Sequence, residues 1–413
     1  MVDSQQQNKE ETYSSAELGE APFFVMSKPA GARCNLACEY CYYLEKEEMY
    51  GNVRKEEMSD ALLEKFVKEY IQSQIQPQVL FTWHGGEPLL RGLPFYKKAA
   101  TLQRAYAEGR QIDNCLQTNG TLLTDEWCEF FAKEGWLIGI SIDGTQAMHD
   151  TYRHTRGKGP SWAQVMRGID LLNKHGVEWN AMATVNAYNA KYPTEFYNFF
   201  RNIGCQYLQF APIVERTTNG HLASVKDIDG KLAPFSVSPT DWGNFCIGVF
   251  DEWINNDVGN IFVQLFEATL ANWMGIPSGL CSMSESCGNN VVMEHNGDVF
   301  SCDHFVFPEY YLGNIHKMPL RQMIHGEKQR RFARIKQEML PQMCKECEWY
   351  FACHGECPRN RFSTTPNGEH HLNYLCKGYQ QFFSHVAPYM DYMKRELQAG
   401  RELRCIDTKN FNI

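Results

Sequence analysis

The sequence predicts an α/β protein in which a parallel sheet is followed by a cysteine-rich second domain. Between about residues 23 and 211, short apolar segments alternate with longer segments whose apolar side chains recur with the period of a helix. From Cys281 onward, cysteines become dense and turn-forming residues become frequent. Alternating strands and helices are typical of parallel βαβ units, which form either an open doubly wound sheet or an incomplete barrel.

Six short segments, rich in β-branched, aromatic and other apolar residues, are the predicted strands. They lie at residues 23–27, 79–84, 114–118, 137–142, 178–184 and 206–211. In both candidate architectures, functional groups gather at the carboxyl ends of such strands. We therefore expect the site residues to follow these segments directly.

Amphipathic helices are predicted between the strands. The clearest spans residues 59–72, where Ser59 occupies the N-cap position. Its apolar face consists of Leu62, Leu63, Phe66, Val67, Tyr70 and Ile71. Further helices are predicted at residues 94–108, 125–133, 162–174 and 193–202.

The regular alternation ends near residue 215. Residues 215–239 are predicted to be mixed and loop-like, and a helical stretch is predicted at 241–273. The cysteine-rich region follows. We therefore place the boundary between the two domains within residues 215–240.

Charge and hydropathy restrict the class of protein. The 413 residues include 40 Lys and Arg against 49 Asp and Glu, a net charge of -9, so no overall positive field favours nucleic acid. No apolar run approaches the length of a membrane-spanning helix, and residues 1–22 form a polar, acidic segment that we predict to be a flexible tail. We expect a cytoplasmic protein without a nucleic-acid or membrane partner. In a reducing compartment, its 16 cysteines indicate metal or redox sites before disulfides.

The first cysteine cluster follows the first predicted strand. Cys34, Cys38 and Cys41 have the spacing C-x3-C-x2-C. Three thiolates can hold three irons of a 4Fe-4S cluster and leave the fourth iron open to another ligand. A zinc knuckle that lacks its fourth ligand is the alternative.

Eight further cysteines are grouped in the second half of the chain. They are Cys281, Cys287, Cys302, Cys344, Cys347, Cys353, Cys357 and Cys376. Eight thiols complete two four-ligand sites, and four thiolates suit zinc as well as an iron-sulfur cluster. The number of thiols alone therefore leaves the metal open.

Several short motifs resemble a known superfamily. The first cysteine cluster, with Tyr40 before its last cysteine, resembles the signature of radical S-adenosylmethionine (AdoMet) enzymes. Gly85-Gly86-Glu87-Pro88 resembles the element that binds the methionine amine there, and the later cysteines resemble the SPASM extension with its two auxiliary clusters. Within that group, the motifs at 117–121, 141–144, 208–210 and 301–303 are similar to those of anaerobic sulfatase-maturating enzymes, over roughly residues 23–390.

The resemblance implies an incomplete (β/α)6 radical-AdoMet barrel over residues 23–235. Linker helices and a cysteine-rich SPASM-type domain with two auxiliary iron-sulfur clusters would occupy residues 236–390, and residues 391–413 would form a C-terminal tail. The implied cofactors are AdoMet and three 4Fe-4S clusters. One cluster would bind AdoMet through an open iron, and the other two would be auxiliary.

The resemblance also implies a role for individual residues. Cys34, Cys38 and Cys41 would ligate the AdoMet-binding cluster. The AdoMet contacts would be Tyr40, Gly85, Gly86, Glu87, Ser141, Arg153 and Val214. One auxiliary cluster would be bound by Cys281, Cys287, Cys302 and Cys357, and the other by Cys344, Cys347, Cys353 and Cys376.

Two of these positions carry explicit chemical expectations. Arg153 would pair with the carboxylate of AdoMet, and Asp303 would be the catalytic base. We expect an apolar site to raise the pKa of Asp303 towards the operating pH. By itself, Asp303 also fits a turn-capping role. Similarly, His84 beside Gly85 either lines the site or packs at the strand end.

The implied reaction is the radical oxidation of an active-site Cys or Ser of an unfolded sulfatase polypeptide to Cα-formylglycine. A flavodoxin or ferredoxin would donate the electron that cleaves AdoMet. One alternative is a maturase that forms a crosslink or thioether in a small ribosomal peptide precursor. A more distant alternative is a non-catalytic zinc or electron-transfer protein.

Overall fold

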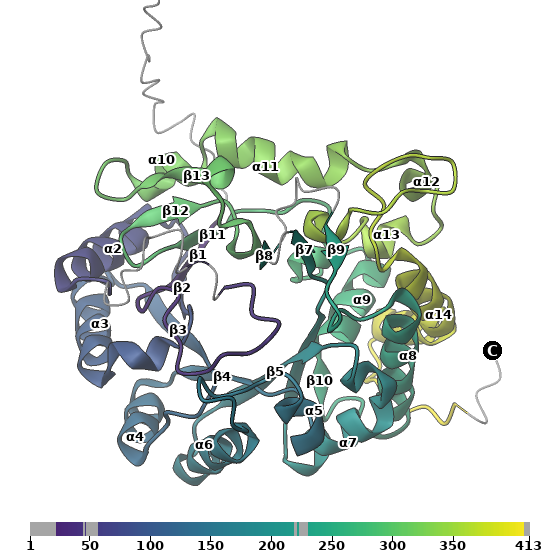
Figure 1. Cartoon of the computed structure of the whole chain (residues 1–413), viewed down its shortest axis with the longest axis horizontal. Helices are drawn as coiled ribbons and strands as arrows, with labels where there is room; N and C mark the ends of the chain where they lie inside the picture. The colour runs from purple at the N-terminus through teal and green to yellow at the C-terminus, as the bar shows by residue number, and fades with distance from the viewer. Residues whose placement is uncertain (1–21, 44–45, 47–56, 219–220, 223–229, 409–413) are drawn as a thin grey trace, which may run out of the picture.

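The computed structural model describes residues 22–43, 46, 57–218, 221–222 and 230–408. The predicted N-terminal tail therefore lies outside the described residues except for its last position. One sheet of ten strands has the order β10-β6-β5-β4-β3-β2-β1-β11-β12-β13. It curves into an open ring, with helices on the outside (Figure 1). The incomplete barrel is thus the correct choice between the two candidate architectures.

The first six strands are parallel and adjacent in chain order, as the sequence predicted. They are β1 (Phe24–Ser27), β2 (Gln78–Trp83), β3 (Gln111–Thr118), β4 (Leu137–Ser141), β5 (Trp179–Val185) and β6 (Tyr207–Pro212). The alternation of buried and half-exposed positions along β2 and β3 is that of strands with one face in the core.

Helices connect these strands on the outer side of the ring (Figure 1). They are α2 (Asp60–Ser73), α3 (Leu93–Tyr106), α4 (Asp125–Glu134), α5 (Gln146–Asp150), α6 (Trp162–His175) and α7 (Pro193–Asn202). Ser59 caps α2, because its Oγ accepts a hydrogen bond of 3.1 Å from the Leu62 amide. All six residues of the predicted apolar face of α2 are buried.

Two expectations for the middle of the chain are wrong. The helical stretch at 241–273 consists of two helices, α8 (Pro239–Asn256) and α9 (Gln264–Met274), with the short strand β10 (Phe262–Val263) between them. Asp257 ends α8, and Gly259 with φ of 82° turns the chain towards β6. The predicted loop at 215–239 contains a three-stranded sheet of β7 (Arg216–Thr218), β8 (His221–Leu222) and β9 (Lys231–Leu232).

The cysteine-rich region extends the same sheet. β11 (Asn290–Met293) pairs in parallel with β1, and β12 (Asp298–Phe300) and β13 (Tyr311–Asn314) follow in antiparallel order. The α-helices of this region are α10 (Leu320–Ile324), α11 (Glu327–Glu338), α12 (Gln342–Lys345), α13 (Tyr350–Cys353) and α14 (Cys376–Gln398). Short 3-10 turns complete the chain: η1 (Pro88–Arg91), η2 (Asn189–Lys191), η3 (Cys281–Met283), η4 (Asp303–Phe305), η5 (Pro308–Tyr310) and η6 (Pro358–Asn360).

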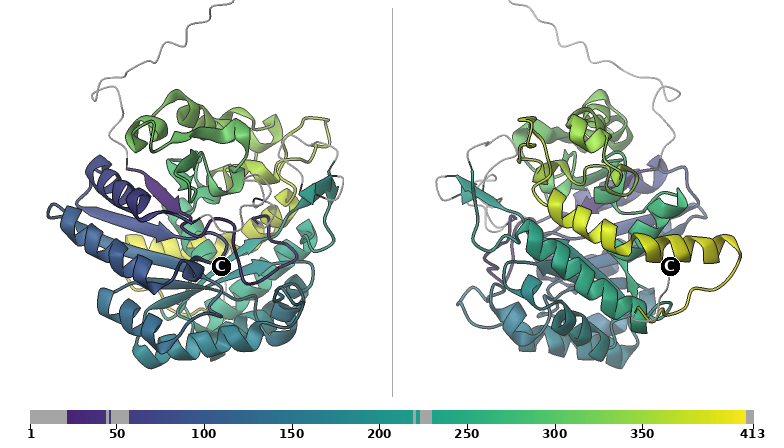
Figure 2. Two further views of the ribbon diagram at one scale, coloured as in Figure 1. Left: turned by 60° about the vertical axis from the view of Figure 1, so that its left-hand side comes forward. Right: turned by 90° about the vertical axis from the view of Figure 1, so that its right-hand side faces the viewer.

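The long helix α14 packs the cysteine-rich region against α8, the first helix after the six parallel strands. It crosses residue 390, so the boundary placed there by the sequence falls inside a helix. α14 lies alongside α8 (Figure 2). A Cβ on Gly378 would lie 2.2 Å from the Pro239 carbonyl oxygen, so this glycine permits the close approach. Among the described residues, none of the helices is both long and apolar enough to span a bilayer.

Candidate functional site

The first cysteine cluster lies on the loop after β1, which crosses the opening of the ring (Figure 1). Main-chain hydrogen bonds hold this loop to the segment after α5, from Ala37 N to His154 O at 2.7 Å and from Glu39 N to Tyr152 O at 2.9 Å. Burial, together with the neighbouring thiols, raises the pKa of Cys34 to about 12. Three such close thiols ionise together only when a metal centre compensates their charge.

The turn after β2 fits against the cysteine loop. A Cβ on Gly86 would lie 2.1 Å from the Arg33 carbonyl oxygen, so only glycine fits there. Main-chain bonds join Gly86 N to Gly31 O at 2.8 Å and Glu87 N to Arg33 O at 2.7 Å. The turn therefore positions the loop that carries Cys34.

The Glu87 side chain is fully buried and faces the loop after β3. It accepts hydrogen bonds from Leu89 N at 2.9 Å, Thr118 Oγ1 at 2.7 Å and Asn119 N at 2.8 Å. Burial raises the pKa of Glu87 to about 7 despite these donors. The side chain thus links the motif at 85–88 to the motif at 117–121, and Asn119 in turn donates to the Cys34 sulfur at 3.7 Å.

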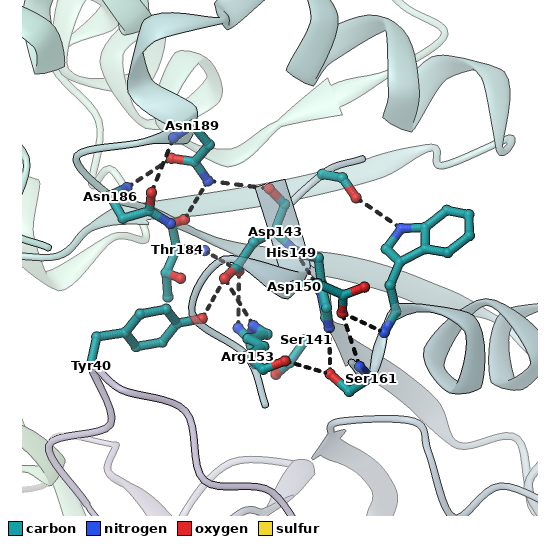
Figure 3. A network of polar contacts seen from close by, with 12 residues as sticks. Tyr40, Ser141, Asp143, His149, Asp150, Arg153, Ser161, Thr184, Asn186 and Asn189 are labelled. Carbon is teal, nitrogen blue, oxygen red and sulfur yellow. Dashed lines mark hydrogen bonds and ion pairs between the residues drawn. The ribbon is translucent and has the colours of Figure 1, made fainter. Parts of the chain in front are cut away.

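The buried carboxylate of Asp143 organises a network of polar contacts just after β4 (Figure 3). Asp143 accepts a hydrogen bond of 3.0 Å from Arg153 Nη2, and an ion-pair distance of 2.9 Å separates its other oxygen from Arg153 Nε. Asp143 also accepts hydrogen bonds from the Tyr40 hydroxyl and Thr184 N. The structure thus gives Arg153 a carboxylate partner within the chain, where the sequence had suggested the carboxylate of AdoMet. Asp143 belongs to the quoted motif at 141–144 but was not singled out there.

The remaining predicted AdoMet contacts lie at the same end of the barrel. Ser141 ends β4, and its Oγ accepts a hydrogen bond of 2.9 Å from Gln117 Nε2. Val214 is buried just after β6. The predicted residues therefore follow β1, β2, β4 and β6 at their carboxyl ends, as expected for this architecture.

Asp303 begins η4 immediately after Cys302. Its carboxylate forms an ion pair with Lys28 and accepts a hydrogen bond from the Tyr42 hydroxyl. Burial raises the pKa of Asp303, but Lys28, together with His84 and His304, outweighs burial and holds the pKa well below its ordinary value. The expectation of a raised pKa is therefore wrong, because the site contains a buried lysine.

Sequence reasoning missed Lys28 and Tyr42. Lys28 has none of its surface exposed and directly follows the apolar strand β1. A lysine at the carboxyl end of a buried strand was the available signal. Tyr42 directly follows Cys41, which the sequence predicts to be a cluster ligand. The Tyr42 ring lies 4.7 Å from the guanidinium carbon of Arg359, which in turn pairs with Glu215 at 2.6 Å.

The four cysteines assigned to the second auxiliary cluster line one hollow. Cys344, Cys347, Cys353 and Cys376 all line this partly open hollow. Aromatic side chains complete the wall, among them Trp349, Tyr350, Tyr379 and Phe383. Four thiols in an apolar enclosure are a suitable donor set for a cubane cluster.

The four cysteines of the other assigned set also lie near one another. Burial raises the pKa of the Cys302 thiol, and Cys281 and Cys287 raise it further. Burial also raises the pKa of the Cys357 thiol, with smaller contributions from Cys302 and Cys281. Within the described ranges, no three Cys, His, Asp or Glu side chains converge closely enough to hold a single ion.

Comparison with known proteins yields two family matches. The Radical SAM superfamily matches residues 29–200, and the iron-sulfur cluster-binding domain named SPASM matches residues 281–348. The first of these covers the strands β2 to β5 and the first cysteine cluster. The second begins at Cys281.

Curated relatives match nearly the whole chain. A serine-type anaerobic sulfatase-maturating enzyme of Bacteroides thetaiotaomicron is 62% identical over 381 residues, which covers 91% of this chain and 92% of the relative. A serine-type enzyme of Klebsiella aerogenes is 36% identical over 93% of this chain and 90% of its own length. A cysteine-type enzyme of Clostridium perfringens is 30% identical over 89% of this chain and 97% of its own length.

A solved structure has the same fold over the same extent. Native anSMEcpe with bound AdoMet superimposes with a TM-score of 0.79 at 29% sequence identity and covers 91% of this chain and 100% of that protein. The form with AdoMet and a Cp18Cys peptide gives a TM-score of 0.80. From these matches and the site geometry, the chain belongs to the anaerobic sulfatase-maturating enzymes of the radical AdoMet superfamily.

Proposed function

We propose that this chain oxidises an active-site residue of an unfolded sulfatase polypeptide to Cα-formylglycine, and that the preferred residue is serine. The observation that carries the proposal is the 62% identity to a serine-type enzyme over 91% of the chain. The cysteine-type relative from Clostridium perfringens is 30% identical over a similar extent. The alternative of a zinc or electron-transfer protein does not explain why the motif at 85–88 resembles an AdoMet-binding element.

The cysteine sets support the assignment of three clusters. Cys34, Cys38 and Cys41 would hold the AdoMet-binding cluster, and the two sets of four would hold the auxiliary clusters. The cofactors, when bound, supply a radical that can remove a Cβ hydrogen atom and a site that can accept one electron. By this assignment, residues 23–235 are the AdoMet region and residues 236–390 the auxiliary region.

Residues of this chain would orient AdoMet at the barrel opening. The amides of Gly85 and Gly86 are bonded to His84 Nδ1 and Gly31 O, both at 2.8 Å, so the carbonyl oxygens of this turn would be the groups that accept from the methionine amine. The Ser141 hydroxyl and the buried Tyr40 lie at the same end of the barrel. Arg153, held by Asp143, presents a fixed positive charge in this region rather than a mobile one.

The oxidation of serine to an aldehyde removes one Cβ hydrogen atom, one hydroxyl proton and one electron. Asp303 would accept the proton in its ionised form, which its low pKa maintains. The low pKa also makes it a weak base, but loss of the electron turns the substrate hydroxyl into a much stronger acid, so the proton can still pass to the carboxylate. Lys28 and Tyr42 contact different oxygens of this carboxylate and so fix its orientation. The target segment would have to enter extended, since a Cβ must reach the opening.

The proposal is tested with protein purified without oxygen and reconstituted with iron and sulfide. We expect about twelve irons per chain and an aldehyde mass shift in a sulfatase-derived peptide incubated with AdoMet and a reductant. Two peptides that differ only in Ser or Cys at the target position should show faster conversion of the serine form. Formation of 5'-deoxyadenosine with neither peptide changed would favour the small-peptide maturase instead.

Asp303→Asn separates proton transfer from the rest of the reaction. We expect this variant to cleave AdoMet but to lose aldehyde formation by roughly 100-fold or more. The ratio of aldehyde to 5'-deoxyadenosine is the measurement. An unchanged ratio would remove Asp303 from its proposed role.

The proposal also includes a cytoplasmic location and a flavodoxin or ferredoxin as the electron donor. Replacement of the chemical reductant by either protein tests the donor.

A further inference from the structure

A buried lysine lies among the cysteine-bearing loops of the second half. Lys336, on α11, has none of its surface exposed. Its Nζ donates to the main-chain carbonyl oxygens of Cys281 at 2.7 Å, Ser282 at 2.8 Å and Ser284. Three acceptors use all three N–H groups of an ammonium, so the geometry requires the charged form. Lys336 thus fixes the loop that carries the first cysteine of one auxiliary set.

A buried arginine holds a strained turn nearby. His354, Gly355 and Glu356 have φ of 47°, 71° and 54°, values that residues other than glycine rarely adopt. Arg361 binds this turn through Nε to Gly355 O at 2.8 Å and through Nη2 to His354 O at 3.0 Å and Glu356 O at 2.9 Å. The turn connects Cys353 to Cys357, which belong to different auxiliary sets.

The two cations are joined to each other through the main chain. Arg361 Nη1 donates to the Lys336 carbonyl oxygen at 2.6 Å. We call Lys336 and Arg361 the cation pair. The nearby buried carboxylate of Glu356 accepts hydrogen bonds from the amides of Asn360 at 3.2 Å and Asn373 at 2.6 Å. The cation pair itself donates to main-chain carbonyls, which solvate its charge without neutralising it.

Two buried cations and a nearby anion stabilise each other electrostatically. Both cations have the Glu356 carboxylate as an electrostatic neighbour. Beside it, Lys336 has the thiols of Cys287, Cys357 and Cys281, and Arg361 has those of Cys357, Cys344 and Cys353. The pair therefore lies within reach of both auxiliary sets. A cubane with four thiolate ligands is negatively charged, and each added electron increases that charge by one. Fixed positive charge in buried surroundings stabilises the more negative, reduced state more strongly.

We propose that the cation pair raises the reduction potential of the auxiliary clusters while it holds the loops that bind them. The proposal rests on the proposed function, because it requires iron-sulfur clusters at the two cysteine sets. Lys336 and Arg361 are then positioning residues that act through the clusters. A raised potential makes a cluster easier to reduce, which is the property required of an electron acceptor.

The test uses the full chain with Cys34, Cys38 and Cys41 all changed to Ala, so that iron loads the auxiliary sites alone. Iron and sulfide content are measured first, and then the midpoint potentials by a redox titration followed by electron paramagnetic resonance. Lys336→Met removes the charge at similar side-chain length, and Lys336→Arg keeps it. Lys394→Met is the matched control, because Lys394 donates to one carbonyl, that of Trp273 at 2.8 Å, near the far end of α14.

We expect Lys336→Met to shift an auxiliary potential to more negative values, with Lys336→Arg close to the parent and Lys394→Met unchanged. An unshifted potential in fully loaded Lys336→Met would overturn the proposal. If Lys336→Met loses iron, loading retained by Lys336→Arg supports a need for charge, and loss of loading in both contradicts it. Zinc or no iron in the parent would instead refute the proposed function, so the two failures are distinguishable.

Discussion

The barrel opening and the cysteine-rich region hold buried charge in different ways. At the opening, carboxylates meet cations directly, as Asp143 does with Arg153 and Asp303 with Lys28. In the cysteine-rich region, Lys336 and Arg361 donate to main-chain carbonyls. Directly paired charges keep their geometry without a guest, whereas buried cations that form no direct ion pair with a described residue gain from an anion beside them. By the proposed assignment, the opening would be formed in advance, and bound clusters would complete the cysteine-rich region.

The largest expected effect is the loss of AdoMet cleavage when the first cysteine cluster alone is changed. Cys34→Ala should abolish AdoMet cleavage, because the first cluster loses one of its three ligands. The iron content should fall from about twelve to about eight per chain, since the auxiliary sets stay intact. Analysis of 5'-deoxyadenosine and iron measures both. Cys405→Ala, at an exposed cysteine outside the sets, is the control. Cleavage retained by Cys34→Ala would contradict the assignment.

The next largest effect is expected when the buried ion pair of Asp143 and Arg153 is broken. Asp143→Asn leaves the buried Arg153 guanidinium without its carboxylate, which we expect to destabilise the fold by about 3–5 kcal/mol. Denaturant unfolding of the chain measures the change. Glu126→Gln, which removes an exposed partner of Lys97, should cause no measurable change. Equal stability of Asp143→Asn and the parent would show that the network in Figure 3 is not structural.

Iron loading should affect the two regions unequally. We expect amide hydrogen exchange to slow most in the loops around Cys281 and Cys353 when the auxiliary sites are filled, because the cations there gain their counter-charge. Strands β3 and β4 should change little. Exchange measured by mass spectrometry on the metal-free and reconstituted chain provides the comparison. Uniform slowing over both regions would contradict the distinction.

The smallest effect concerns pH. Burial raises the pKa of Glu87 from 4.5 to about 7, so between these values the folded chain retains a proton that the unfolded chain releases. The corresponding stability is complete below pH 4.5 and is lost as pH rises through 7, at about 1.4 kcal/mol per pH unit. Glu87→Gln stays neutral and should reduce this slope. Unfolding midpoints of the metal-free chain at several pH values test the prediction, and parallel slopes would refute it.

Much of the barrel could be predicted because its signals are local. The six strands lie within three residues of their predicted bounds, since each is a short apolar run between helices of clear period. β11, β12 and β13 escaped prediction because these strands of three or four residues lie in a turn-rich region, where no regular alternation with helices marks them as β1 is marked. The helical stretch expected at 241–273 is helical over most of its length, but the break at Gly259 and the two-residue strand β10 were not predicted.

The sequence by itself determined the chemistry of this protein: eleven cysteines in a fixed order, the glycines of the turn after β2, and an acid after Cys302. Covalent spacing fixes these features, so no folding is needed to recognise them. The tertiary structure alone decided which charges meet. Lys28 and Asp303 are 275 residues apart, and their contact reverses the pKa shift expected for a buried carboxylate. Electrostatic energy depends on distance and burial in three dimensions, and neither can be read along the chain.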